Sequence, residues 1–153
     1  MSRRDQIVMT EAEIAEFLAP PRNLQVATIN QDGTPHLVTM YYAVIDGKIA
    51  FWTYRKSQKV LNLRRDPRIT VLVEDGKAYG ELQGVSIAGR ANLSEDHDAV
   101  MAVGTRLFTR YFGDELDDAA RAGVEASAAK RVAITVEPER VVSWDHTKLG
   151  GGY

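Results

Sequence analysis

The stretch LQVATINQDGTPHLVTMYYAVIDGKIAFWTY, residues 24–54, decides the fold class of this chain. It contains three runs rich in β-branched and aromatic residues, which are typical of strands. Asp32-Gly33 and Asp46-Gly47 lie between the runs, and this residue pair favours tight hairpin turns because a positive φ costs Gly little and Asp tolerates it. The stretch therefore predicts an antiparallel meander with strands at 24–30, 35–45 and 48–54.

The rest of the sequence adds helices and further strands around this meander. Thr10 followed by Glu13 is a capping-box pattern, and Pro20 and Pro21 end the helix that it begins. Helices are expected at 10–18, 57–65, 96–112 and 115–130, and strands at 69–73, 79–93, 132–137 and 141–144, with the last two stretches forming either one strand or two. Because the strands are mostly consecutive, we expect a mainly β fold, a small antiparallel barrel with peripheral helices.

The composition is that of one globular domain. The 153 residues are 44% hydrophobic and 26% charged. We therefore treat residues 1–153 as a single unit, with a helical insertion at 94–130 and an irregular tail at 145–153. The chain has no cysteine, which excludes disulfides, thiolate catalysis and cysteine-ligated metals.

The N-terminal residues and the lengths of the apolar runs indicate the cellular location of the protein. No apolar run reaches the roughly 18 residues that span a bilayer. Charges interrupt the opening MSRRDQIVMTEAEIAEF, where a secretory signal needs an apolar stretch. We expect a cytoplasmic protein without a membrane span.

Common catalytic and binding motifs are absent from the sequence. His36, His97 and His146 lack the short spacing of a dedicated metal site, so no metal is expected. Ser143 and Asp145-His146 contain the letters of a hydrolytic triad, but neighbouring residues of one terminal segment offer no geometry for it. Neither GxGxxG nor GxxxxGK[ST] occurs, which excludes Rossmann and P-loop nucleotide binding. No catalytic residue is assigned.

The segment YRKSQKVLNLRRDPR, residues 54–68, is the most informative for function. With Ser57 as the N-cap, the free N–H groups of the first turn and the helix dipole favour an anion there. Ser57 and Lys59 add a hydroxyl and an ammonium group to that turn. The other interpretation is a solvated basic helix whose apolar residues only pack, and spacing alone leaves both open.

The charge pattern favours a small anion over a polyanion. The net charge is -2, yet six basic residues stand against one acid between positions 55 and 68. A nucleic-acid-binding protein usually spreads its basic residues over a whole face. Positive charge confined to fourteen residues of an otherwise acidic chain suits one phosphate, and no nucleic-acid partner is expected.

This segment, together with several other stretches of the sequence, resembles a known family. The shared features are Asp32-Gly33-Thr34-Pro35 between two strands, the aromatic strand Phe51–Tyr54, Lys59 and the run from Asn62 to Arg68, and a later strand that contains Gly84 and Ala88-Gly89-Arg90-Ala91. Together they are similar to the pyridoxamine 5′-phosphate oxidase-like superfamily of split β-barrel flavoproteins. Within it, the chain looks most like the short branch that binds the deazaflavin coenzyme F420.

The resemblance implies a fold, an assembly and a cofactor site. The fold would be an FMN-binding-protein-like split barrel, assembled as a homodimer with the cofactor in a groove between subunits. Ring contacts would come from Val38, Thr39 and Met40 on one strand and from Trp52 and Thr53 on another. The phosphate would lie on Ser57 and Lys59, and the partner subunit would contribute Lys77 and Tyr79. The alternative for Met40 and Trp52 is plain barrel core.

The function implied is that of an oxidoreductase in which reduced coenzyme F420 gives hydride to a small organic acceptor. Because the cofactor carries the chemistry, no protein nucleophile is needed. One alternative is an FMN-dependent enzyme on the same scaffold. Another is a non-catalytic flavin- or haem-binding protein, for which His36, the histidine in a predicted strand, would be the axial ligand.

Two further points stay open at the level of sequence. A proton donor for the reduced product has four candidates besides water: Tyr41, Tyr42, Lys148 and Tyr153. The tail, with Trp144, Lys148 and Tyr153, is either a frayed terminus or a segment that folds over the cofactor.

Overall fold

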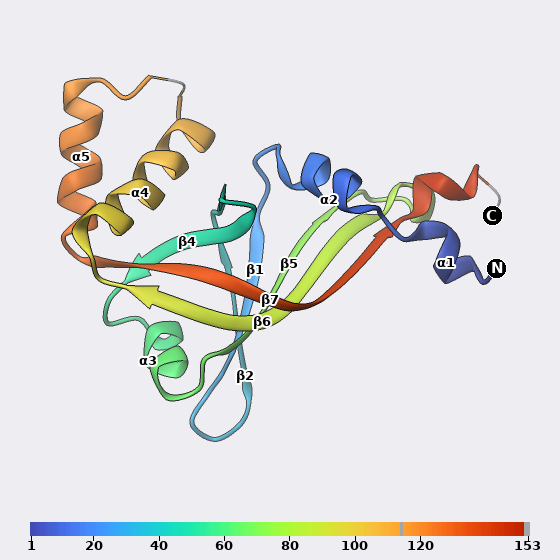
Figure 1. The fold of residues 1–153 in the computed structure, drawn as a ribbon, viewed down its shortest axis with the longest axis horizontal. Coiled ribbons are helices and arrows are strands. Elements are labelled where there is room, and N and C mark those ends of the chain that lie inside the picture. Colours follow the sequence, from blue (N-terminus) through green and yellow to red (C-terminus); the bar gives the residue numbers. More distant parts are fainter. Residues whose placement is uncertain (114, 152–153) are drawn as a thin grey trace.

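A computed structural model describes residues 1–113 and 115–151. Seven antiparallel strands form one sheet in the order β2-β1-β5-β6-β7-β4-β3, and Figure 1 shows how the sheet curls. The fold is therefore mainly β, a partly open antiparallel barrel with helices outside it, as predicted. The strands are β1 (Leu24–Ile29), β2 (Pro35–Met40), β3 (Ala43–Ile45), β4 (Lys48–Tyr54), β5 (Arg68–Asp75), β6 (Gln83–Ser94) and β7 (Arg131–Asp145).

The predicted strand 35–45 is wrong as a single strand. β2 pairs with β1, whereas β3 pairs with β4 at the opposite edge of the sheet. Tyr41 and Tyr42 alone separate β2 from β3. The Tyr42 ring is fully buried and its hydroxyl donates to Leu18 O at 2.8 Å, so the chain turns a corner here instead of continuing a hairpin.

The corner at Tyr41–Tyr42 dictates the shape of the sheet. Two residues span only about 7 Å when extended, yet they join the two edge strands of a seven-stranded sheet. The sheet must curl until its edges meet at this corner. The main core fills the curl, with Leu24, Phe51, Val71 and Val85 among its buried members.

Of the two possibilities for the end of the sheet, the structure has the single strand. Residues 132–137 and 141–144 both belong to β7, because it pairs with β6 along nearly its whole length. The pairing register shifts between Ala88 and Gly89, opposite Pro138, where a β-bulge accommodates a residue without an N–H. The predicted strand 79–93 begins later, since Tyr79–Glu81 form the 3-10 helix η1.

Three helices lie on the main barrel. α2 (Glu11–Leu18) has the predicted capping box between Thr10 and Glu13, and it buries Phe17 and Leu18 in the core. α3 (Gln58–Arg65) follows Ser57 as predicted. α1 (Arg3–Ile7) was not predicted, because it has five residues and buries none of them.

The insertion at 94–130 forms a helical hairpin of α4 (His97–Tyr111) and α5 (Asp118–Ala128), which lies beside β4 in Figure 1. The α4 helix contacts both β4 and β3. Val100, Val103 and Leu107 pack with Ala43, Ala50 and Ala133 in a second, smaller core. The α4 helix approaches β4 closely at Gly104, against which the Trp52 ring lies. The hairpin is therefore attached to the sheet through small residues.

The tail is anchored to the N-terminal segment. His146–Leu149 form the 3-10 helix η2, and Lys148 Nζ donates to Glu13 Oε2 at 2.6 Å and to Val8 O at 2.8 Å. Trp144 belongs to β7, with its ring over Gly84. The expectation of an irregular tail is thus wrong for 145–149, and Tyr153 lies outside the described residues. In the part of the chain that the structure covers, no helix is long and apolar enough to cross a membrane.

Two helical glycines give a paired test of this packing. A Cβ at Gly104 would lie 2.3 Å from the Trp52 ring, whereas a Cβ at Gly123 on α5 meets nothing within 4 Å. Gly104→Ala should lower the free energy of unfolding by about 1–3 kcal/mol because the ring must move. Gly123→Ala should raise it by up to about 1 kcal/mol through helix propensity. Urea unfolding measures both, and equal effects at the two positions would contradict the close packing of Trp52 on α4.

Candidate functional site

A cluster of three polar side chains lies where β4 meets α3. Lys59 Nζ donates to Thr53 Oγ1 at 3.0 Å, and Thr53 Oγ1 donates to Ser57 Oγ at 3.4 Å. The Ser57 side chain makes no capping bond to the first turn of α3. The amide groups that open the helix therefore lack a side-chain cap and can donate to an anion. The structure thus brings Thr53, Ser57 and Lys59 together, three of the residues singled out in the sequence.

Lys59 is the unusual member of this cluster. Its exposed fraction is 8%, and the Thr53 hydroxyl is its hydrogen-bond partner. Within residues 1–113 and 115–151, no carboxylate lies at ion-pair distance from it. Burial lowers the pKa of Lys59 below the ordinary 10.5 because the charged form is poorly solvated. Its position in the first helical turn adds an unfavourable interaction with the helix dipole. An anion at this end of α3 would remove both penalties.

A buried asparagine fixes α3 against the sheet. Asn62 is 0% exposed, and its Nδ2 donates to Thr28 Oγ1 and Asn30 Oδ1, each at 3.0 Å. Its Oδ1 accepts from Gln58 Nε2 at 2.9 Å. These bonds hold the N-terminal turn of α3 relative to β1. The sequence marked Asn62 only through the family resemblance, because its partners on the sheet side, Thr28 and Asn30, lie more than thirty residues away.

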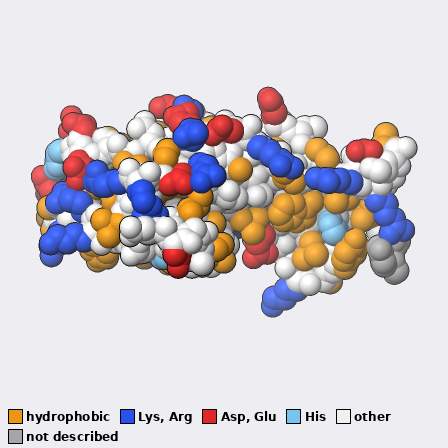
Figure 2. All heavy atoms as spheres, turned by 90° about the horizontal axis from the view of Figure 1, so that it is seen from below, with side chains coloured by type: hydrophobic (Ala, Val, Ile, Leu, Met, Phe, Trp, Pro, Cys, Tyr) orange, Lys and Arg blue, Asp and Glu red, His pale blue; other side chains and the backbone are white. Residues whose placement is uncertain are grey.

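The neighbouring basic residues do not form one positive patch. Arg55 and Arg64 pair with Glu95 at 2.8 and 3.4 Å. Arg68 pairs with Asp66 and lowers the pKa of that carboxyl to about 2 through its hydrogen bonds. Figure 2 shows basic side chains interspersed with acidic and hydrophobic ones on the face seen from below. Among the basic residues of this segment, Lys59 is therefore distinguished by being buried without an acidic partner in the described part of the chain.

The residues predicted to contact the cofactor ring lie on β2 and β4, and on each strand they point to both faces of the sheet. Val38 and Met40 pack against the main core, whereas Thr39 points away from it and donates to Gln25 Oε1 at 2.7 Å. On β4, Thr53 faces Lys59, whereas Trp52 faces the α4–α5 hairpin. Strand alternation explains both divisions. These residues therefore do not all line one surface of a single protomer.

A cavity of about 470 Å³ lies between β4 and the hairpin, and it brings together Met40, Trp52 and Thr53. The hairpin supplies much of its wall, including Leu107, Phe108 and Val124. Sequence reasoning missed Arg131, which also lines this cavity. Arg131 reaches the cavity because it pairs with Tyr54 across β4 and β7, and no local sequence pattern predicts that pairing.

Lys77 and Tyr79 lie far from the polar cluster within one protomer. η1 stands at the end of β6 where Gln83 pairs with Asp145, which is the end near the C-terminus in Figure 1. α3 lies beside the other end of the sheet. The Tyr79 ring contacts the His146 ring edge-on, and His146 Nδ1 lies 2.8 Å from Tyr79 O.

The candidate proton donors have different surroundings. Tyr41 lines the cavity and stacks on Tyr111 with centroids 4.1 Å apart. Tyr42 is buried with its hydroxyl bonded to backbone, and burial raises its pKa. Lys148 is paired with Glu13 at the tail. Tyr41 is therefore the candidate that borders a cavity.

His36, the candidate axial ligand, pairs with Thr28 across β1 and β2 on the side of the main core. Its Nδ1 is buried, and in the described part of the chain it has no hydrogen-bond partner. Among the described residues, no group of three or more His, Cys, Asp or Glu side chains lies close enough together to hold a metal ion.

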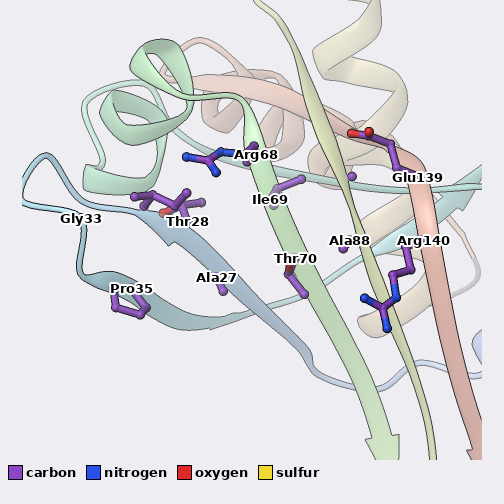
Figure 3. Close-up of a pocket in the computed structure, with 12 residues that line it drawn as sticks. Ala27, Thr28, Gly33, Pro35, Arg68, Ile69, Thr70, Ala88, Glu139 and Arg140 are labelled. Atoms are coloured by element: carbon purple, nitrogen blue, oxygen red, sulfur yellow. The ribbon is translucent and has the colours of Figure 1, made fainter.

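The opposite face of the sheet carries a shallow groove of about 400 Å³, shown in Figure 3. Ala27, Pro35, Thr70 and Ala88 line its floor, and Arg68, Glu139 and Arg140 stand around it. Leu37, which pairs with Ala27, has an exposed fraction of 67% on this face. The groove and the exposed Leu37 therefore lie on the same outer face of the sheet.

The sequence was compared with family models and with curated proteins. Residues 10–145 match the sequence model of the family described as pyridoxamine 5′-phosphate oxidase. No curated protein sequence matches the chain.

Solved structures share the fold. A conserved hypothetical protein from Mycobacterium tuberculosis is 46% identical, with a TM-score of 0.93 over 100% of this chain and 95% of its own. An F420 reductase is 25% identical, with a TM-score of 0.65 over 82% of this chain and 93% of its own. An FAD-binding protein from Mesorhizobium loti is 20% identical, with a TM-score of 0.66 over 89% and 94%, respectively.

The buried charge of Lys59 gives a prediction about pH. Between its lowered pKa and 10.5, the folded protein binds fewer protons than the unfolded chain, so this lysine makes stability rise with pH. Lys59→Met removes the buried charge. The variant should therefore be more stable than the wild type at pH 7, and the difference should shrink as pH approaches 10.5. Urea unfolding at several pH values measures this difference. A variant that is less stable at every pH would mean that Lys59 has a structural role instead.

Proposed function

Because the chain belongs to the pyridoxamine 5′-phosphate oxidase family, we propose that it is an oxidoreductase that uses the deazaflavin coenzyme F420 as its hydride carrier. The proposed substrate is a small organic acceptor. FMN is the alternative cofactor, since a phosphate site serves either molecule.

The observation that carries this proposal is the buried ammonium of Lys59, which has no acidic partner among the described residues and lies beside Ser57 and the uncapped end of α3. A buried cation without a counter-ion costs stability. A phosphate at this end of α3 would accept from Lys59, from the Ser57 hydroxyl and from the first-turn amides. The likeness to an F420 reductase supports the choice of cofactor.

The chain's own residues would then bind and orient the cofactor. Lys59, Ser57 and Thr53 would hold the phosphate, and Met40 and Trp52 would border the ring. Reduced F420, when bound, supplies a hydride, so the protein needs no nucleophile. Tyr41 is the candidate to hold a proton near an acceptor, since its ring borders the cavity.

The proposal includes a second copy of the chain. Lys77 and Tyr79 are too far from Lys59 to serve the same site within one protomer, so they would act from a partner subunit. The groove in Figure 3, with Leu37 beside it, offers the face for such a contact. The partner would be a homodimer mate that completes the cofactor groove.

Parallel fluorescence titrations with F420 and FMN test the cofactor. The wild type should bind F420 more tightly than FMN. Lys59→Met should weaken binding roughly 10- to 100-fold, the loss expected for a hydrogen bond to a charged group. Lys56→Met, which removes an exposed lysine three residues earlier, is the matched control and should have little effect. Preference for FMN would favour the alternative cofactor, and binding of neither would refute the redox assignment.

Light scattering after size-exclusion chromatography tests the assembly. The wild type should elute as a dimer, and Leu37→Arg should yield monomers because it places a charge in the proposed interface. Leu61→Arg changes a leucine of similar exposure on α3 and should remain dimeric. A wild-type monomer, or a dimer unaffected by Leu37→Arg, would show that this face is not the interface.

A further inference from the structure

The cavity between β4 and the α4–α5 hairpin is not needed to hold a phosphate. Trp52 and Tyr54 supply aromatic rings to its wall. They lie on the face of β4 opposite to the one where Thr53 meets Lys59. Its volume of about 470 Å³ is in the range of small-molecule sites.

The walls of this cavity are aromatic and aliphatic. The Trp52 ring lies against α4 at Gly104, and Leu107, Phe108 and Val124 complete the apolar surface. Phe112 lies at the rim with an exposed fraction of 66%, in contact with the Tyr41 ring at 5.9 Å between centroids. Large aromatic side chains around a hollow favour a flat, apolar ligand.

One cation stands at this cavity. The Arg131 guanidinium lies over the Tyr54 and Trp52 rings, 4.3 and 4.8 Å from their centroids. It donates one hydrogen bond, from Nη1 to Ser127 O at 3.0 Å. Across residues 1–113 and 115–151, no carboxylate pairs with it. A guanidinium has five N–H donors in a planar fork that matches a carboxylate. Arg131 is therefore preorganised by two rings and retains donors for an anionic group.

We propose that this cavity binds a small aromatic carboxylate. Its rings lie against Trp52 and Phe108, and its carboxylate accepts from Arg131. The cavity also borders Met40 and Thr53. This ligand class is accordingly the substrate class of the proposed oxidoreductase, and in that role it rests on the proposed function. Binding itself does not depend on a cofactor.

Calorimetry on the cofactor-free protein tests the site, with 2-naphthoate as the probe and 2-naphthamide as its neutral counterpart. The wild type should prefer the acid. Arg131→Gln should weaken binding of naphthoate roughly tenfold or more and leave naphthamide nearly unchanged. Arg121→Gln, an exposed arginine on α5, is the matched control.

Filling the cavity gives a second, independent test. A Cβ added at Gly123, a residue that lines the cavity, would meet no atom within 4 Å, so the backbone there accepts a larger side chain. Gly123→Leu should abolish binding of both probes, whereas Ala122→Leu, next to it on α5 and outside the lining, should not. Ala120→Leu, at another lining residue, should repeat the effect of Gly123→Leu.

The outcomes separate this inference from the proposed function. No binding of naphthoate to the wild type, or binding unaffected by Arg131→Gln and Gly123→Leu, would overturn the inference even where F420 binds. Naphthoate binding that follows these variants supports it, and stands even where F420 does not bind and the redox assignment fails.

Discussion

A two-residue link between the edge strands is the constraint on which the rest of the structure depends. β2 ends at Met40 and β3 begins at Ala43, yet these strands occupy opposite edges of the sheet. The sheet has to curl to bring its edges together. The buried Tyr42 ring, bonded through its hydroxyl to Leu18 O, holds the corner closed. The barrel is therefore a consequence of chain connectivity as much as of strand pairing.

This curl gives β4 two distinct chemical faces. On one face Thr53 meets Lys59 and Ser57, where α3 begins. On the other, Trp52 and Tyr54 meet Arg131 and the α4–α5 hairpin. A single strand thus separates a polar cluster suited to a phosphate from an apolar cavity with one cation. The proposed phosphate contacts lie on the first face, whereas the proposed aromatic carboxylate and the cofactor ring bordered by Trp52 lie on the second. Each proposed anion would contact a charged side chain without an acidic partner in the described residues.

Local signals in the sequence predicted a large part of the fold. The Asp-Gly turns, the Thr10–Glu13 capping box and the helix after Ser57 all form, because neighbouring residues determine them. The corner at Tyr41–Tyr42 was missed since β-forming residues continue through it. The sequence left open whether residues 132–144 form one strand or two, and pairing with β6 decides for one because a bulge accommodates Pro138. Both features depend on contacts between distant residues.

The residues of the candidate site could be named from the sequence to a similar extent. Ser57 and Lys59 were singled out by their position at a helix start, and Thr53 and Asn62 through the family resemblance. The contacts of Asn62 and the place of Arg131 at the cavity required the tertiary structure, since their partners lie on other strands and helices. The ion pair between Lys148 and Glu13 likewise depends on the contact between the N-terminal and C-terminal segments.

The protonation of Lys59 tests the central claim most directly. NMR of the lysine side chains can follow its pKa in the free protein and with F420 bound. The account predicts a pKa below the ordinary 10.5 in the free protein, and a rise when the phosphate group binds, because the anion stabilises the charged form. A pKa of Lys59 that stays the same on saturation with the cofactor would contradict the assignment of the phosphate to this site.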